Sequence, residues 1–265
     1  MKKLPIAMAG ALVVSLGTMG TAQASSFLST GIGQVGKIDT STGTFTPLNK
    51  NGITFFDIAL SNNGDLFGVT ISALHSIDKN TGLSSQIGNL GVFLNALDFS
   101  NENVLYGAGD DSFYTIDTAS GAASLVAKIP NFISSGDIAF DSVNNQFFAT
   151  SLSVDGSSDI LFSIAKDGKA TEIGSIGFSD IYGLFFENGT LFGYTGDQQQ
   201  ITIDPTTGAG SFSQNVVGGV GMLFGAAAAF PSTTVPSATV PEPMSVLSLL
   251  AVGAFGAGVL SKHKP

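Results

Sequence analysis

Aspartate carboxylates are the main groups in this sequence that could do chemistry, because 20 acidic residues stand beside 10 lysines and no arginine, cysteine or tryptophan. Carboxylate oxygens are ligands that Ca²⁺ prefers in proteins. Two acidic turns are therefore candidate cation sites: Asp155 with Asp159, and the adjacent pair Asp110 and Asp111. Neither turn matches the twelve-residue calcium loop, so solvated hairpin tips are the competing interpretation. Calcium is the one cofactor that the sequence suggests.

Catalytic chemistry has little other material. His75 is the one histidine between residues 25 and 230, and no serine or aspartate motif accompanies it, so we expect it on a strand surface. The sequence contains no phosphate-binding loop, dinucleotide fingerprint or zinc-ligand spacing. A net charge of −10 argues against a nucleic-acid partner. We therefore expect that the protein is not an enzyme. Four tyrosines offer rings for stacking a sugar, but their spacing defines no clear platform: Tyr106, Tyr114, Tyr182 and Tyr194.

A repeated stretch must position these groups. The segment 74–82 reads Leu-His-Ser-Ile-Asp-Lys-Asn-Thr-Gly, and related segments place isoleucines at 38, 77, 116, 164 and 203. Alternating apolar residues favour a strand, the aspartate starts a turn, and the glycine supplies the positive φ that closes a hairpin. A step of about 40 residues is typical of a repeat architecture.

Each repeat contains four strand-like pieces, which is the composition of a β-propeller blade. The first unit opens at a second strand, Phe27-Leu28, and the missing first strand is found near the C-terminus at 222–230. We therefore predict an all-β fold over residues 25–230, a five-bladed β-propeller whose closing blade is shared between the two ends. A β-solenoid or an open sandwich is the alternative, but neither explains the out-of-phase ends.

Two sets of aspartates receive structural interpretations from this repeat. The first set precedes Thr/Ser-Gly turns, and we expect it to cap those turns: Asp39, Asp78, Asp117 and Asp204. The second set falls on the predicted inner strands and lines the axial channel, where we expect structural hydrogen bonds: Asp57, Asp98 and Asp137.

The N-terminus has the features of a secretory signal peptide. A basic start, Met1-Lys2-Lys3, precedes an apolar run from Leu4 to Leu16 and a small-x-small site, Ala22-Gln23-Ala24. We predict a signal helix over 1–24 that signal peptidase removes. A first core helix of the fold is the competing interpretation.

The repeat resembles the blades of secreted bacterial propellers of the YVTN and quinoprotein-like kind. The resemblance rests on hydrophobic-x-Ile-Asp-x-x-Thr-Gly, preceded by Leu-Phe/Tyr-Gly about ten residues earlier, over residues 25–230. It implies an architecture and no particular activity, because propellers host many functions.

The C-terminus resembles a PEP-CTERM sorting signal. A Pro/Ser/Thr linker over 231–240 leads into a box of Val240, Pro241, Glu242 and Pro243. The signal spans 241–265, with an apolar transmembrane helix expected at 244–260 and a basic stop at the end that consists of Lys262 and Lys264. The resemblance implies export, transient insertion into the inner membrane and processing by an exosortase. A C-terminal membrane anchor that is never cleaved is the alternative.

Together these features predict an exported protein of the cell surface or extracellular matrix. Its propeller would be a non-enzymatic binding or scaffold module, with exopolysaccharide or matrix proteins of a biofilm as partners. The alternative is an extracellular lyase or hydrolase that uses carboxylates at one propeller face. Acids that converge on a deep axial pocket would favour the enzyme, and scattered acids on an open face would favour binding.

Overall fold

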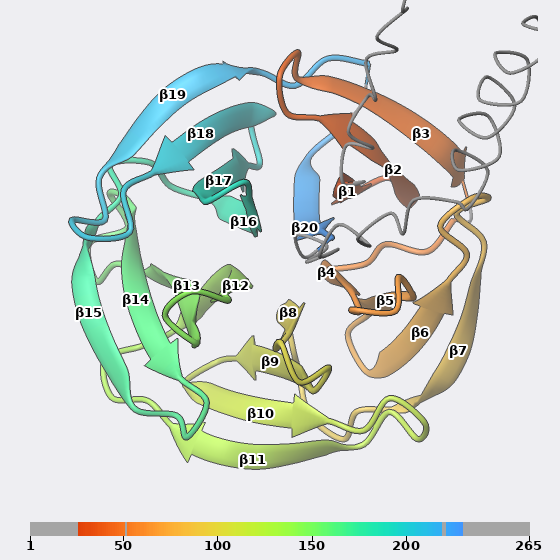
Figure 1. Cartoon of the computed structure of the whole chain (residues 1–265), viewed down its shortest axis with the longest axis horizontal. Helices are drawn as coiled ribbons and strands as arrows, with labels where there is room; N and C mark the ends of the chain where they lie inside the picture. The colour runs from red at the N-terminus through yellow and green to blue at the C-terminus, as the bar shows by residue number, and fades with distance from the viewer. Residues whose placement is uncertain (1–25, 51, 219–220, 230–265) are drawn as a thin grey trace, which may run out of the picture. The chain divides into compact units, whose positions relative to one another are not determined.

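The computed structural model describes residues 26–50, 52–218 and 221–229, and these residues form five four-stranded antiparallel sheets arranged in a ring (Figure 1). Blade 1 contains β4 (Asp57–Leu60), β5 (Leu66–Val69), β6 (Ala73–Ile77) and β7 (Ser84–Asn89). Blade 2 contains β8 (Ala96–Phe99), β9 (Leu105–Gly109), β10 (Ser112–Ile116) and β11 (Ala123–Lys128). Blade 3 contains β12 (Ser134–Asp141), β13 (Gln146–Leu152), β14 (Asp159–Ala165) and β15 (Ala170–Ser175). Blade 4 contains β16 (Ile181–Glu187), β17 (Thr190–Thr195), β18 (Gln199–Ile203) and β19 (Gly210–Asn215).

Blade 5 is assembled from the two ends of the ring. It contains β20 (Leu223–Ala228), β1 (Ser26–Thr30), β2 (Gln34–Asp39) and β3 (Thr44–Lys50), in that order across the sheet. β1 pairs with β20 in an antiparallel register that joins Ser26 to Ala228. The closing blade therefore has one strand from the C-terminal side and three from the N-terminal side, which confirms the predicted five-bladed propeller. All strands of the ring come from residues 26–228, so closure needs no strand from elsewhere.

The turn chemistry of the repeat is also as expected. In blade 1, Oδ1 of Asp78 accepts hydrogen bonds from the backbone N–H groups of Asn80 and Thr81 at 2.8 and 3.1 Å. Gly82 closes this turn with a φ of 72°, a conformation that glycine adopts without steric cost. These N–H donors hold the pKa of the Asp78 carboxyl below its usual value. The equivalent aspartates of three other hairpins make the same local bonds: Asp39, Asp117 and Asp204.

The core lies between the blades. Small residues such as Ala59 and Ala139 occupy the inner strands, and neither exposes any surface to solvent. Aromatic rings pack between neighbouring blades, as in the pair Phe67 of blade 1 and Phe99 of blade 2, whose ring centroids lie 5.5 Å apart. Burial of apolar surface between the sheets supplies the main stabilisation of the ring.

The inner strands β4, β8, β12, β16 and β20 lie nearest the centre in Figure 1, and the outer strands lie at the periphery. We call the side on which the inner strands begin the entry face, and the side on which they end the exit face.

The predicted signal peptide, the linker and the sorting box with its apolar span lie outside the described residues. Among the described residues, no helix is long and apolar enough to cross a membrane.

Candidate functional site

Aspartate side chains connect the inner strands along the propeller axis. Asp57 stands at the start of β4 and joins blade 1 to blade 2. Its Oδ1 accepts a hydrogen bond from the N–H of Ile58 at 2.7 Å, and its Oδ2 accepts one from Leu97 in β8. Gly225 of β20 approaches from blade 5, where any Cβ would overlap the side chain and backbone of Asp57. A glycine at this position therefore lets blade 5 close onto the axis.

Asp137 in β12 makes the same kind of connection for the rest of the ring. Its Oδ1 accepts a hydrogen bond from Ile138 at 2.6 Å, and its Oδ2 accepts one from Leu184 of β16 at 2.5 Å and one from Ala226 of β20 at 3.3 Å. Asp57 and Asp137 thus satisfy one equivalent backbone N–H from each of the five blades: Ile58, Leu97, Ile138, Leu184 and Ala226.

Asp98 forms a second tier of this arrangement, nearer the exit face. Its Oδ1 accepts the N–H of Phe99 at 2.8 Å, and its Oδ2 accepts the N–H of Phe140 in β12 at 2.7 Å. Asp98 therefore joins blade 2 to blade 3. We refer to Asp57, Asp98 and Asp137 as the axial aspartates. They make the structural hydrogen bonds that the sequence predicted.

Burial determines the protonation of these carboxyls. Removal from water raises the pKa of Asp98 to about 7, against the opposing effect of its two N–H donors. Burial raises the pKa of Asp57 well above its usual value, and burial followed by repulsion from Asp57 does the same for Asp137. Burial and the repulsion between the two carboxyls therefore both favour the protonated forms of Asp57 and Asp137.

A cavity of about 310 Å³, which we call the axial mouth, lies on the entry face next to the tier formed by Asp57 and Asp137. Residues from all five blades form its wall: Phe56, Phe93, Asn95, Ser135, Gly136, Tyr182, Met222 and Phe224. Five of them occupy one equivalent position, two residues before the backbone N–H that Asp57 or Asp137 accepts in each blade: Phe56, Asn95, Gly136, Tyr182 and Phe224. One position of the repeat therefore supplies five of the eight wall residues.

Aromatic rings form a continuous run around the mouth. Tyr182 and Phe224 meet edge to face at 5.8 Å, Phe224 and Phe56 stack at 6.0 Å, and Phe56 and Phe93 meet edge to face at 5.8 Å. Gly136 completes the wall at blade 3, where a Cβ would collide with the backbone and ring of Tyr182. The ring of Tyr182 can therefore lie against the backbone of blade 3.

The polar groups of the mouth have carboxylates behind them. Tyr182 Oη donates to Oδ1 of Asp180 at 2.7 Å, and Ser135 Oγ donates to Oδ2 of Asp159 at 2.8 Å. Asp159 also accepts the N–H of Ile181 at 2.8 Å. Burial raises the pKa of Asp159 to about 6, which leaves it ionised at pH 7. Burial and the neighbouring Asp180 raise the pKa of Tyr182, which keeps its hydroxyl protonated.

A second cavity of about 300 Å³ lies on the exit face. Its wall includes Asp98, residues 140–144 of the β12–β13 hairpin, Phe185, Phe186 and Ala228. Asp141, the other acid there, accepts N–H bonds from Val143 and Asn144 within its own turn. Asp98 is thus the one wall carboxylate that is not engaged in a turn.

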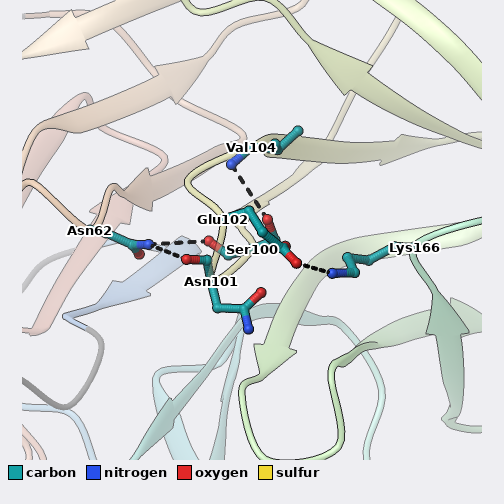
Figure 2. A network of polar contacts seen from close by, with 6 residues as sticks. All are labelled: Asn62, Ser100, Asn101, Glu102, Val104 and Lys166. Atoms are coloured by element: carbon teal, nitrogen blue, oxygen red, sulfur yellow. Dashed lines mark hydrogen bonds and ion pairs between the residues drawn. The ribbon is translucent and has the colours of Figure 1, made fainter. Parts of the chain in front are cut away.

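The rim of the exit face is held by polar contacts between neighbouring hairpins, as Figure 2 shows. The side-chain amide of Asn62 in blade 1 donates to the backbone carbonyl oxygens of Ser100 and Asn101 in blade 2 at 3.5 and 2.9 Å. Glu102 in the same turn of blade 2 pairs with Lys166 of blade 3. These contacts join three successive blades and have the character of structural links.

The predicted cation-binding residues are separated by the fold. Asp155 caps the exposed β13–β14 turn by accepting bonds from Ser157, whereas Asp159 is buried and binds Ser135 and Ile181. Asp111 pairs with Lys128 at 2.7 Å, and its neighbour Asp110 lies in the same β9–β10 turn. Within the described ranges, no three histidine or acidic side chains gather in a way that could hold a metal ion. Calcium binding at these turns stays a prediction.

The expectation for His75 was wrong. His75 is 7% exposed and packs edge to face against Phe55, with ring centroids 5.5 Å apart. Burial lowers the pKa of its imidazole, so it is neutral at pH 7. Ala73, Leu74 and His75 are consecutive buried residues of β6, so strand alternation alone does not predict the burial of His75.

Comparison with known proteins gives a fold and no family. The sequence matches no protein-family profile, and no curated protein is significantly similar to it. One chain from the crystal structure of a nidogen–laminin complex superposes with a TM-score of 0.58 and 8% identity, covering 78% of this chain and 98% of that one. A chain from a study of the de novo evolutionary emergence of a symmetrical protein gives a TM-score of 0.52 and 17% identity, covering 78% and 99%. These likenesses support the propeller fold alone.

Proposed function

We propose that this protein is exported through the inner membrane and that its propeller is a non-enzymatic binding or scaffold module of the cell surface or extracellular matrix. The signal peptide and the PEP-CTERM-like tail support the route, through signal peptidase and an exosortase. The tail further suggests that exopolysaccharide or matrix proteins are the partners.

The axial mouth is the observation that carries the binding role. It is a concave cavity of about 310 Å³ to which all five blades contribute, and half of its wall residues are aromatic. Cavities of this kind, with a few polar groups at their wall, are the usual location of ligand sites. A chain with a similar fold forms part of a nidogen–laminin complex, so the proposed scaffold role has a parallel among proteins of this architecture.

Asp57 and Asp137 favour binding over catalysis. Carboxylates do converge on the axis, but each oxygen of Asp57 and Asp137 already accepts at least one backbone N–H. Such groups hold the ring together and have little freedom to transfer protons to a substrate.

The second candidate function, an extracellular lyase or hydrolase, depends on Asp98. This residue lines the exit-face cavity, and its pKa of about 7 suits a general acid. Incubation of the host's exopolysaccharide with the wild-type propeller and with Asp98→Asn tests this role. Release of reducing or unsaturated ends by the wild type alone would establish the enzyme, and no release by either would remove it.

The binding role is tested with the purified 25–230 propeller on immobilised host exopolysaccharide and, separately, on purified matrix proteins, with and without calcium. We expect saturable binding to one of them that Phe93→Ser weakens. Val143→Ser is the matched control, because Val143 is equally apolar and is exposed on the exit face. Absence of saturable binding, or equal losses in both variants, would contradict a binding site at the mouth.

The proposed route has its own test. Mass spectrometry of the protein recovered from the cell surface should find no residues beyond the Pro-Glu-Pro box. An intact tail on the surface protein would contradict the processing step.

A further inference from the structure

The wall of the axial mouth is rich in aromatic rings. Four aromatic rings from four blades form the run Tyr182, Phe224, Phe56 and Phe93, with successive centroids 5.8 to 6.0 Å apart. The face of an aromatic ring carries partial negative charge and attracts a cation within about 6 Å of its centroid. Several rings around one small cavity therefore favour a cationic group over a neutral one of the same shape.

The hydrogen-bonding groups at the mouth point to a ligand that donates. The hydroxyls of Tyr182 and Ser135 already donate their protons to Asp180 and Asp159. The Asn95 side-chain nitrogen donates to the carbonyl of Ser134 at 3.1 Å, while its Oδ1 is buried and has no partner among the described residues. An unpaired acceptor at the wall would be satisfied by an N–H or O–H of the ligand.

Negative charge lies immediately behind this wall. The buried Asp159 and the solvent-exposed Asp180 each bind a wall hydroxyl, and the whole chain carries a net charge of −10. The buried Asp159 carboxylate therefore favours a cation in the cavity and disfavours an anion, whereas solvent screens the charge of Asp180 and makes its effect smaller. A bare metal ion is also a poor occupant, because the wall offers rings where such an ion needs several oxygen ligands.

We propose that the axial mouth binds an organic cation, an alkylammonium or guanidinium group carried by the partner molecule. This inference rests on the binding role proposed above and specifies the chemistry of the group that enters the mouth. A neutral hexose fits less well, because the wall hydroxyls have committed their protons and a sugar needs both donors and acceptors. Amino-sugar polymers and lysine- or arginine-bearing proteins both carry cationic groups of this class.

The test is isothermal titration calorimetry of the 25–230 propeller with choline and with 3,3-dimethyl-1-butanol, its neutral isostere. We expect choline to bind about tenfold more tightly or better, since cation–π attraction in a partly desolvated site amounts to about 1–2 kcal/mol. N-acetylargininamide in a second titration distinguishes the guanidinium from the alkylammonium group. Equal affinities for choline and its isostere, or no binding of either cation, would overturn the proposal.

Matched variants locate the effect. Phe56→Leu keeps an apolar side chain at the mouth and should weaken choline binding about fivefold, because one π face is lost. Asp180→Asn should also weaken it, whereas Asp65→Asn, which removes the same charge from the exit-face turn after β4, should leave it unchanged. Equal losses from Asp180→Asn and Asp65→Asn would show attraction by net charge alone and would contradict a specific site.

The two proposals fail in distinguishable ways. If neither cation binds but Phe93→Ser still abolishes partner binding, the binding role stands and the cation chemistry is wrong. If the cations bind and no matrix partner does, the mouth is a cation site and the proposed function is wrong.

Discussion

Asp137 offers the sharpest test of how the propeller is closed. Its carboxyl accepts backbone N–H bonds from Ile138, Leu184 and Ala226, which belong to three different blades. Replacement by alanine leaves three buried donors without an acceptor, and each such donor costs about 1–3 kcal/mol. Loss of the repulsion between Asp57 and Asp137 offsets part of that cost. We therefore expect Asp137→Ala to lower the free energy of unfolding by at least about 3 kcal/mol.

The assay is urea unfolding of the 25–230 propeller followed by far-ultraviolet circular dichroism, which suits a protein without tryptophan. Asp137→Asn is the conservative comparison, because its one carbonyl oxygen can still accept from Leu184 and Ala226 while the N–H of Ile138 faces the amide nitrogen. It should lie between the wild type and Asp137→Ala. Asp117→Ala, which removes an exposed turn cap in blade 2, is the control for loss of any carboxylate. If Asp137→Ala were no more destabilising than Asp117→Ala, the axial aspartates would not hold the ring as we describe.

Three further predictions follow from the same geometry. Burial raises the folded-state pKa of Asp98 to about 7, so its contribution to stability is full below about pH 4 and is lost as the pH rises through 7. Urea unfolding should therefore give a larger free energy of unfolding at pH 5 than at pH 8, and Asp98→Asn should reduce that difference. An unchanged difference in the variant would refute this role of Asp98. Gly225→Ala places a Cβ on the Asp57 side chain and backbone, so it should lower the melting temperature sharply or prevent folding, and a near-wild-type melting temperature would show that the axis is looser than the structure indicates. Lys166→Ala breaks an ion pair with Glu102 in which the side chains are 24% and 54% exposed, so the urea midpoint should fall only slightly; a large drop would mean that this contact of the exit-face rim stabilises the ring more than a partly exposed ion pair does.

The architecture was predictable because its determinants are local. Each repeat carries an alternating strand, an aspartate that caps the turn and a glycine with positive φ, as at Asp78 and Gly82. These signals recur at a regular step, and the out-of-phase ends of the chain then require the strand pair β1 and β20 to close the ring. Local turn chemistry and the out-of-phase ends of the chain are therefore enough to predict the fold.

The axial aspartates were predictable in place but not in partner. Superposing the repeats of the sequence put Asp57, Asp98 and Asp137 on inner strands. Which neighbouring blade donates a hydrogen bond to each carboxyl depends on how closely the five inner strands meet at the axis. Gly225 and Ala226 of β20 belong to that contact, and no local pattern connects them to Asp57 or Asp137.

The axial mouth was missed, although the sequence held a signal for it. Its five equivalent wall positions carry Phe56, Asn95, Gly136, Tyr182 and Phe224, and this mixture of aromatic, amide and glycine residues escapes a search for repeated motifs. Comparing the same position across all five inner strands would have shown three aromatic residues facing one axis. His75 was misplaced for a related reason, because its burial depends on the neighbouring ring of Phe55 and on no feature of its own strand.

The central claim is that the axial mouth is where this protein binds its partner. The most direct measurement is backbone amide shift mapping of the isotope-labelled 25–230 propeller as choline is added. The account predicts that the shifts concentrate at the starts of the inner strands, around Phe56, Asn95, Tyr182 and Phe224. Shifts centred on the exit face around Asp98, or no shifts at all, would contradict it.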